Sequence, residues 1–179
     1  AASAGLELSR REGRARKSAP ITLDLAGIAK GLGVDEMARV MDEFRIPSWL
    51  VGIDGEMRAK GAKPDGSMWA VAHERPDPHI REAMGVLELQ DMAVATSGNY
   101  RHVREVGGRT VSHTMDPRTG APLQNEVASV TVLASRCMTA DAWATALMVM
   151  GVEAGLEAAR THGIDVIFVL QDGTVRSTL

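Results

Sequence analysis

The stretch Thr139-Ala140-Asp141-Ala142-Trp143-Ala144-Thr145-Ala146-Leu147 gives the most informative pattern in the chain. It is predicted to form a helix that runs on to a stop at Gly151. Asp141 and Thr145 are four residues apart, so they share one face of that helix. A carboxylate and a hydroxyl placed in this way offer oxygen ligands, which suit Mg²⁺ better than Zn²⁺. On spacing alone, a structural role for Asp141 in the first turn, behind a cap at Thr139, is the preferred interpretation.

The composition indicates one compact domain with an aliphatic core. The chain has 179 residues, of which 45% are hydrophobic and only 3% aromatic. The net charge is -3 and the basic residues form no long run, so the sequence does not support a nucleic acid as the main partner. The single Cys137 excludes an intrachain disulfide, and no apolar run is long enough to cross a bilayer.

The order of the predicted elements is that of an α+β domain with mostly antiparallel strands and packed helices. Residues 1–20 are polar and basic and are expected to be a lead-in or boundary segment, which leaves 21–179 as the domain. Helices are predicted over 27–44, from about residue 139 to Gly151, and over 153–162. Strands are predicted over 21–25, 49–53, 56–60, 69–74, 85–89, 92–97, 100–106, 109–113, 129–134, 166–170 and 174–177, with turns at Asp54-Gly55, Gly107-Gly108 and Asp172-Gly173 among others.

The predicted first helix begins with an unusual set of glycines. Gly27, Gly31 and Gly33 stand where a helix former would be preferred, and each interior glycine costs up to about 1 kcal/mol relative to alanine. Either close packing or a ligand near the backbone should compensate for that cost. A glycine-bearing helix start also exposes N–H groups that suit phosphate, with Lys30 as an added charge and Asp24 as an acceptor for a polar ligand.

A second cluster surrounds His113. The histidine is predicted at a strand end, just before the turn residues Asp116-Pro117-Arg118-Thr119-Gly120. In such a place His113 is able to act as a general base near neutral pH. A structural hydrogen bond is the commoner role for a single histidine at a strand end, and Asp116 is more often a turn former than a catalyst.

Taken together, the clusters resemble the ApbE family, the FAD:protein FMN transferases, over about residues 23–170. The motifs that carry the resemblance are Asp-Leu-x-Gly-Ile-Ala-Lys-Gly from Asp24, Ala-Thr-Ser-Gly from Ala95, Ser-His-x-x-Asp-Pro-x-Thr-Gly from Ser112, Ser-Val-Thr-Val from Ser129 and Ala-Asp-Ala-x-Ala-Thr-Ala-Leu from Ala140. The chain departs from the family around Val51-Gly52-Ile53-Asp54-Gly55-Glu56, where many relatives have Gly-Gly-Asp. The resemblance implies an ApbE-like, T-fold-type domain.

The resemblance also implies a set of site residues. Asp141 and Thr145 would bind Mg²⁺ through side chains, and Gly27 and Ala144 would bind it through backbone carbonyls. Other positions match residues that contact FAD, the substrate: Asp24, Lys30 and Met115. His113 matches the histidine proposed to assist the acceptor hydroxyl.

The implied activity is transfer of FMN from FAD to a Ser or Thr hydroxyl of an acceptor protein, with release of AMP. The alternatives are an FAD pyrophosphatase that uses water as acceptor and a non-catalytic FAD-binding module. Subunits of redox-driven membrane complexes are the expected acceptors, and a periplasmic or envelope-anchored location is expected for the full-length protein. Because family members are much longer, we expect this chain to be the C-terminal portion, with the N-terminal part missing.

Overall fold

The computed structural model describes residues 5–9, 11–100, 103–106 and 109–179. Its helices are α1 (Ala26–Glu43), α2 (Cys137–Met150) and α3 (Val152–His162). A six-stranded sheet in the order β12-β11-β10-β7-β4-β3 forms the centre of the fold. Its strands are β3 (Trp49–Ile53), β4 (Glu56–Lys60), β7 (Ala93–Gly98), β10 (Val127–Ala134), β11 (Asp165–Leu170) and β12 (Val175–Ser177).

Every pairing within this sheet is antiparallel, and three separate hairpins accompany it. The hairpins pair β1 (Leu6–Ser9) with β2 (Arg14–Lys17), β5 (Trp69–Glu74) with β6 (Ala83–Leu89), and β8 (Val103–Val106) with β9 (Arg109–Ser112). The prediction of an α+β fold with mostly antiparallel strands is therefore confirmed. The β8–β9 pairing also agrees with the sequence, although the predicted turn at Gly107-Gly108 lies outside the described residues.

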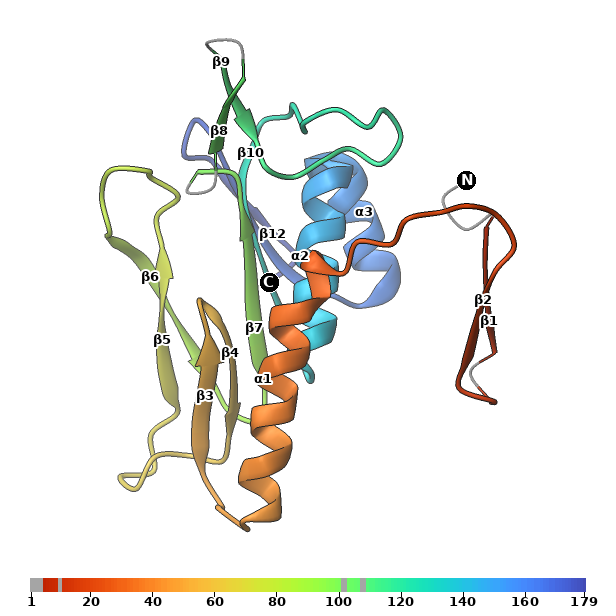
Figure 1. Ribbon diagram of the computed structural model, residues 1–179. Helices are drawn as coiled ribbons and strands as arrows, with labels where there is room; N and C mark the ends of the chain where they lie inside the picture. The colour runs from red at the N-terminus through yellow and green to blue at the C-terminus, as the bar shows by residue number, and fades with distance from the viewer. Residues whose placement is uncertain (1–4, 10, 101–102, 107–108) are drawn as a thin grey trace.

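Alternate residues of the sheet pack against different layers. Along β7, Ala93 and Ala95 contact the helix layer, whereas Val94 joins a separate cluster with residues of the β5–β6 ribbon. The helices thus cover one face of the sheet, with α2 in the middle, and β5–β6 lies on the other side (Figure 1). Successive side chains of a strand point to opposite faces of the sheet, so β7 is buried on both faces.

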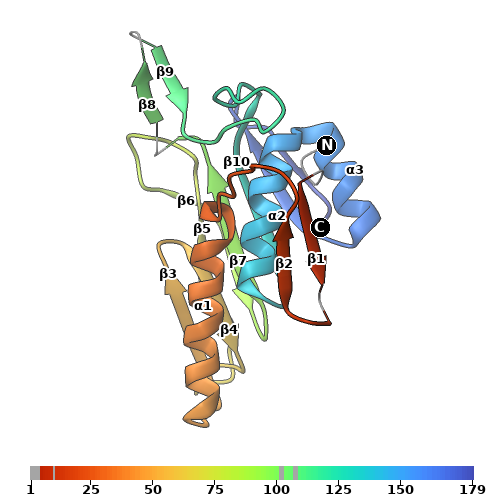
Figure 2. The same cartoon turned by 45° about the vertical axis from the view of Figure 1, so that its right-hand side comes forward.

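The structure differs from the sequence prediction before α1. Residues 21–25, which were predicted as a strand, have no strand partner, and the side chains of Leu23 and Leu25 are exposed. In contrast, the segment predicted as a polar lead-in contains the β1–β2 hairpin. Figure 2, turned from the view of Figure 1, shows this hairpin in front of the helix layer. A strand forms only where a neighbouring strand satisfies its backbone groups, and residues 21–25 pair with no strand among the described residues.

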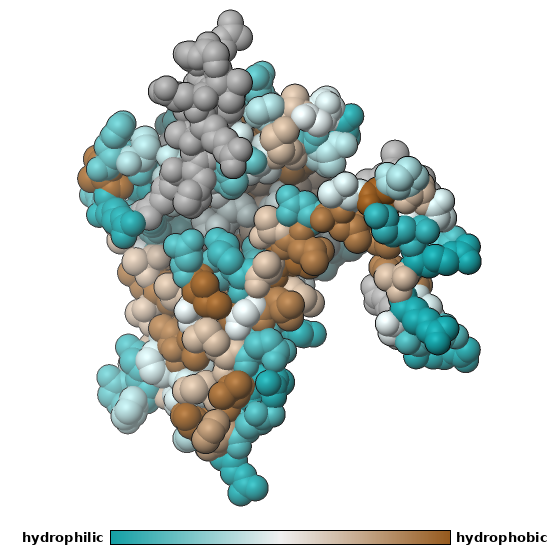
Figure 3. Space-filling model, viewed as in Figure 1, coloured by the Kyte–Doolittle hydropathy of each residue, from teal (hydrophilic) through white to brown (hydrophobic). Residues whose placement is uncertain are grey.

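The outer surface of α1 carries several exposed apolar side chains. The exposed apolar side chains on α1 and just after it are Leu32, Met37, Val40, Phe44 and Ile46. Figure 3 shows hydrophobic surface gathered over this part of the molecule. In the part of the chain that the structure describes, no helix is long and apolar enough to span a membrane.

Candidate functional site

A cavity of about 1050 Å³ opens where the start of α1, the middle of α2 and the β5–β6 ribbon meet. The β3–β4 turn, the end of β7 and the loop after β9 complete its walls. Seven of the eight site residues named from the sequence line it: Asp24, Gly27, Lys30, His113, Met115, Asp141 and Thr145. Segments that are far apart in the sequence are therefore brought together around one space.

Two glycines allow α1 and α2 to cross at very short range. A Cβ atom built on Gly27 would lie 2.9 Å from Thr145 Oγ1, and one on Gly31 would lie 2.5 Å from the backbone oxygen of Cys137. Neither position has room for a larger residue without movement of the opposing helix. Close packing therefore accounts for these glycines. It is one of the two explanations that the sequence offered, the other being a ligand near the backbone.

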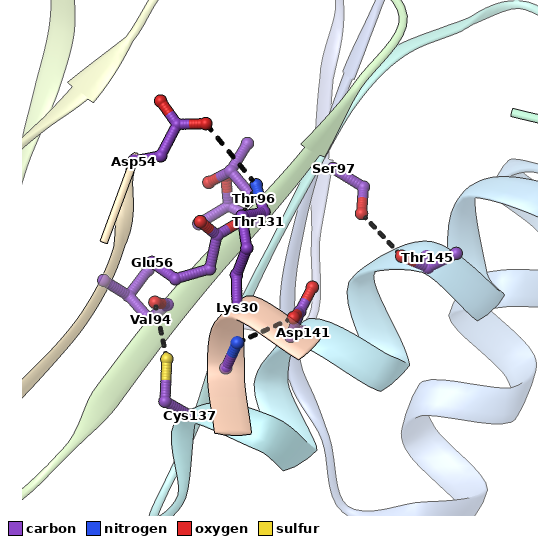
Figure 4. Close-up of polar contacts among 11 residues, drawn as sticks. Lys30, Asp54, Glu56, Val94, Thr96, Ser97, Thr131, Cys137, Asp141 and Thr145 are labelled. Carbon is purple, nitrogen blue, oxygen red and sulfur yellow. Dashed lines mark hydrogen bonds and ion pairs between the residues drawn. The ribbon is translucent and has the colours of Figure 1, made fainter. Parts of the chain in front are cut away.

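Asp141 joins the two helices directly. Its side chain is buried, with 4% of the residue exposed, and its Oδ2 accepts a hydrogen bond of 2.9 Å from the backbone N–H of Gly31. Burial raises the pKa of Asp141, while the Gly31 N–H and the charge of Lys30 act in the opposite direction. One turn later, Thr145 Oγ1 lies 3.0 Å from Ser97 Oγ (Figure 4). Asp141 and Thr145 thus occupy the same face of α2, as predicted.

The predicted cap of α2 is wrong. The helix begins at Cys137, so Thr139 lies inside the first turn, and the N-cap Arg136 makes no side-chain capping bond. Asp35 of α1 supplies the cap instead: its Oδ1 accepts from Cys137 N at 2.9 Å and its Oδ2 from Met138 N at 3.2 Å. Each helix therefore provides the other with a hydrogen-bond partner, Asp35 from α1 and Asp141 from α2.

A positive charge and two acids lie at the same end of the cavity. Lys30 Nζ lies 2.9 Å from Glu56 Oε1 and 3.9 Å from Asp54 Oδ2 (Figure 4). Burial lowers the pKa of Lys30, but its hydrogen bond to Glu56 and the charges of Glu56, Asp54 and Asp141 outweigh burial and raise it, so Lys30 stays charged. Glu56 is 1% exposed, and its Oε2 has no hydrogen-bond partner among the described residues.

The remaining site residues lie nearer the solvent, with one exception. Asp24 is exposed, and its Oδ1 accepts from Ala26 N at 2.8 Å, which orients it at the first turn of α1. His113 and Met115 are also exposed and line the cavity from the loop after β9. Ala144 differs, because its side chain belongs to the core between α2 and the sheet and the residue is not among those lining the cavity. A carbonyl ligand at Ala144 stays a prediction.

Sequence reasoning missed three contributors to this site. It named Asp54 and Glu56 only within a stretch that departs from the family, yet both lie close to Lys30 and Glu56 makes the shorter contact. The available signal was that Glu56 shares a face of β4 with Arg58 and Lys60, and all three residues pair with charged residues of α1. Ser97 was quoted only within a motif. His73 was not singled out, although it is buried in the cavity wall.

The donors at the crossing of α1 and α2 fit a small hard cation. Asp141 offers a carboxylate, Thr145 a hydroxyl and Gly27 a backbone carbonyl, all of them oxygen ligands of the kind that Mg²⁺ prefers. No group of three or more His, Cys, Asp or Glu residues able to hold a metal occurs among the described residues. A metal at this place would therefore depend on hydroxyl and carbonyl oxygens, and the site has no resemblance to a zinc centre.

Comparisons with known proteins agree with this geometry. The sequence profile of the ApbE family matches residues 2–168. The FAD:protein FMN transferase of Vibrio cholerae is 45% identical over 149 residues, which are 83% of this chain and 45% of that protein. The protein of the same name from Treponema pallidum is 34% identical and is matched over 89% of this chain and 47% of its own length.

Solved structures show the same relationship. The flavinyl transferase ApbE of Pseudomonas stutzeri, in its apo form, has a TM-score of 0.80 and 39% identity, over 97% of this chain and 54% of that one. The ApbE protein of Thermotoga maritima has a TM-score of 0.85 and 29% identity, over 97% of this chain and 56% of that one. The chain spans about half the length of the curated relatives that it matches. On this combination of sequence, fold and site, the chain belongs to the ApbE family.

Proposed function

We propose that this chain forms the metal- and phosphate-binding part of a Mg²⁺-dependent enzyme that transfers FMN from FAD to a Ser or Thr hydroxyl of an acceptor protein, releasing AMP. The observation that carries the proposal is the contact between α1 and α2. Gly27 lies against Thr145, and the Gly31 N–H holds Asp141, all beside the charged Lys30. Two relatives that this chain resembles are named FAD:protein FMN transferase, which supports the same reaction.

In this proposal Asp141, Thr145 and the Gly27 carbonyl hold the cation, and the bound Mg²⁺ supplies neutralising charge to phosphoryl oxygens. Lys30 adds a fixed positive charge next to the pyrophosphate. Asp24 accepts from the Ala26 N–H and so holds the first turn of α1, where the positive end of the helix dipole favours an anion. Phosphoryl transfer needs mainly such positioning and charge stabilisation, because the enzyme contributes little covalent chemistry.

His113 is assigned the proton transfer. The hydroxyl oxygen of the acceptor forms a bond to the phosphorus on the FMN side of the pyrophosphate, while the bond from that phosphorus to the AMP oxygen breaks. The hydroxyl proton passes to His113, and AMP leaves with the bonding electron pair. The exposed position of His113 on the cavity wall suits this role, because a protein-borne hydroxyl must approach from solvent. Met115, two residues later, is 49% exposed and is placed to contact the flavin nucleotide.

The proposed acceptors are subunits of redox-driven membrane complexes, and the proposed location of the full-length protein is the periplasm or the cell envelope. Both follow from the family resemblance. The acceptor chemistry that the cavity supports is more general: a flexible segment with a Ser or Thr hydroxyl that reaches His113.

The test is a transfer assay with FAD, Mg²⁺ and a flavin-acceptor domain, read as a fluorescent protein band on a denaturing gel and as AMP release. We expect transfer by the wild-type chain, none by Asp141→Asn, and wild-type behaviour by Asp165→Asn. Asp165 is an exposed aspartate at the start of β11, outside the cavity lining, so it is the matched control. Full activity in Asp141→Asn would refute the metal assignment.

The same assay distinguishes the other two candidate functions, the FAD pyrophosphatase and the FAD-binding module. AMP release without labelled protein would show that water is the acceptor, which is the pyrophosphatase. FAD binding without AMP release under any acceptor would show a binding module. His113→Ala should slow transfer while FAD affinity changes little, because this residue acts on the acceptor and not on the nucleotide.

A further inference from the structure

A buried histidine in the cavity wall has no part in the chemistry described so far. His73 lies on β5 and is 8% exposed, and the apolar residues Val71 and Leu87 line the same wall. Its partner across the β5–β6 ribbon is Gly85, where a Cβ atom would make only an ordinary contact of 4.0 Å with His73 Cβ. A polar ring beside apolar wall residues is the kind of group that fixes the orientation of a ligand.

Two hydroxyls on the sheet hold this imidazole. His73 Nε2 lies 3.1 Å from Thr131 Oγ1, which lies 2.8 Å from Thr96 Oγ1. Figure 4 draws the two threonines on neighbouring strands of the sheet. Thr131 is fully buried, so its hydroxyl is fixed by these partners and not by solvent. The chain of contacts connects the β5–β6 ribbon to the sheet and sets the position of the ring.

The hydrogen bonds among His73, Thr131 and Thr96 also determine what His73 offers to a ligand. Burial lowers the pKa of His73, so the ring is neutral at neutral pH, with one nitrogen as a donor and the other as an acceptor. If Thr131 donates to Nε2, then Nδ1 carries the hydrogen. If Nε2 donates to Thr131, the two hydroxyls reverse and Nδ1 becomes an acceptor. Both arrangements keep the hydrogen bonds among His73, Thr131 and Thr96, and Nδ1 is the nitrogen that takes no part in them.

The cavity has two chemically different parts. Lys30, Asp141 and Thr145 form a charged and polar part beside α1 and α2, whereas the apolar side chains of Val71 and Leu87 lie near His73, and charged residues of the β5–β6 ribbon also line that wall. A nucleotide has the same division, with phosphates at one place and a planar ring rich in nitrogen and oxygen at another.

We propose that His73, positioned by Thr131 and Thr96, hydrogen-bonds the planar heteroaromatic ring of the bound nucleotide and is a specificity-determining residue of the cavity. This proposal rests on the proposed function, since it takes FAD as the ligand. FAD has two such rings, the isoalloxazine and the adenine, and the experiment distinguishes them.

The experiment measures the dissociation constants of FAD, FMN and ADP for the wild-type chain and for His73→Leu. We expect His73→Leu to bind FAD roughly tenfold more weakly, the effect of one hydrogen bond to a group that is left unpaired. It should also weaken either FMN or ADP, but not both, and the ligand affected identifies the ring. His79→Leu is the matched control, because His79 is exposed and lies outside the cavity lining.

Thr131 is a positioning residue, and its variants test the hydrogen-bonded chain. Thr131→Val should weaken FAD binding several-fold, and Thr131→Ser should restore it because the hydroxyl returns. A direct contact also predicts that the imidazole nitrogen resonances of His73 shift when FAD is added, whereas those of His79 do not. A role in folding alone would leave this shift absent.

Unchanged affinities in His73→Leu, or equal losses for FMN and ADP, would overturn the assignment of His73. In that case the proposed function would still stand, provided that the wild-type chain binds FAD. Failure of the wild-type chain to bind FAD at all would overturn both.

Discussion

Replacing Gly31 with alanine tests the helix crossing on which the site is built. The added Cβ would lie 2.5 Å from the backbone oxygen of Cys137 and 2.7 Å from the Cα of Met138. These are backbone atoms at the start of α2, so no side-chain rotation relieves the contact. Alanine gains about 1 kcal/mol of helix propensity over glycine, but overpacking that displaces backbone costs roughly 3 kcal/mol. We expect a net loss of about 2 kcal/mol in the free energy of unfolding.

Gly33 provides the matched control in the same helix. A Cβ there would meet only the terminal methyl Cδ1 of Ile53, at 2.9 Å, and that methyl is able to rotate away. Gly33→Ala should therefore be neutral or more stable by up to about 1 kcal/mol. Urea denaturation followed by circular dichroism measures both variants, and Mg²⁺ binding should be lost only in Gly31→Ala. If Gly31→Ala proves as stable as Gly33→Ala, the reasoning about the crossing is refuted.

Three further predictions concern single side chains. Because the pKa of Asp141 is raised, its carboxylate takes up a proton at a higher pH than an ordinary aspartate does. The affinity for Mg²⁺ should therefore fall as the pH is lowered through that pKa. Calorimetric titrations at a series of pH values would show no such fall if Asp141 were not a ligand. Asp35→Ala should lower the free energy of unfolding by about 3 kcal/mol, because it leaves the half-buried Arg58 and the first N–H groups of α2 without their acceptor. The control Asp42→Ala removes an exposed carboxylate and should cost under ~1 kcal/mol. Equal losses for the two variants in urea denaturation would contradict the capping role. Burial raises the pKa of the Cys137 thiol to about 12, so a thiol reagent should label it only after unfolding, and rapid labelling of the folded chain would contradict its burial.

Local patterns predicted much of the fold. The Asp54-Gly55 pair joins β3 to β4 in the predicted place, where both residues adopt positive φ angles. The stop of α2 at Gly151 also agrees, with φ of 77°. In these cases the residues that decide the structure are neighbours in the sequence, so the pattern contains all that is needed.

Long-range partners account for the failures. The cap of α2 comes from Asp35, which lies 102 residues before Cys137 in the sequence, so nothing near Thr139 indicates it. The contact between His73 and Thr131 spans 58 residues in the same way. Seven of the eight site residues named from the sequence line one cavity, because the family resemblance carries long-range information that composition and periodicity lack; their roles stay predictions.

The central claim is that the start of α1 and the polar face of α2 together hold a divalent cation beside a nucleotide pyrophosphate. A crystal grown with FAD and Mn²⁺, examined by anomalous scattering, tests it most directly. We predict one peak at bonding distance, about 2.0–2.3 Å, from the Asp141 carboxylate, the Thr145 hydroxyl and the Gly27 carbonyl. Manganese bound at some other position, with FAD present and these three groups unliganded, would contradict the account.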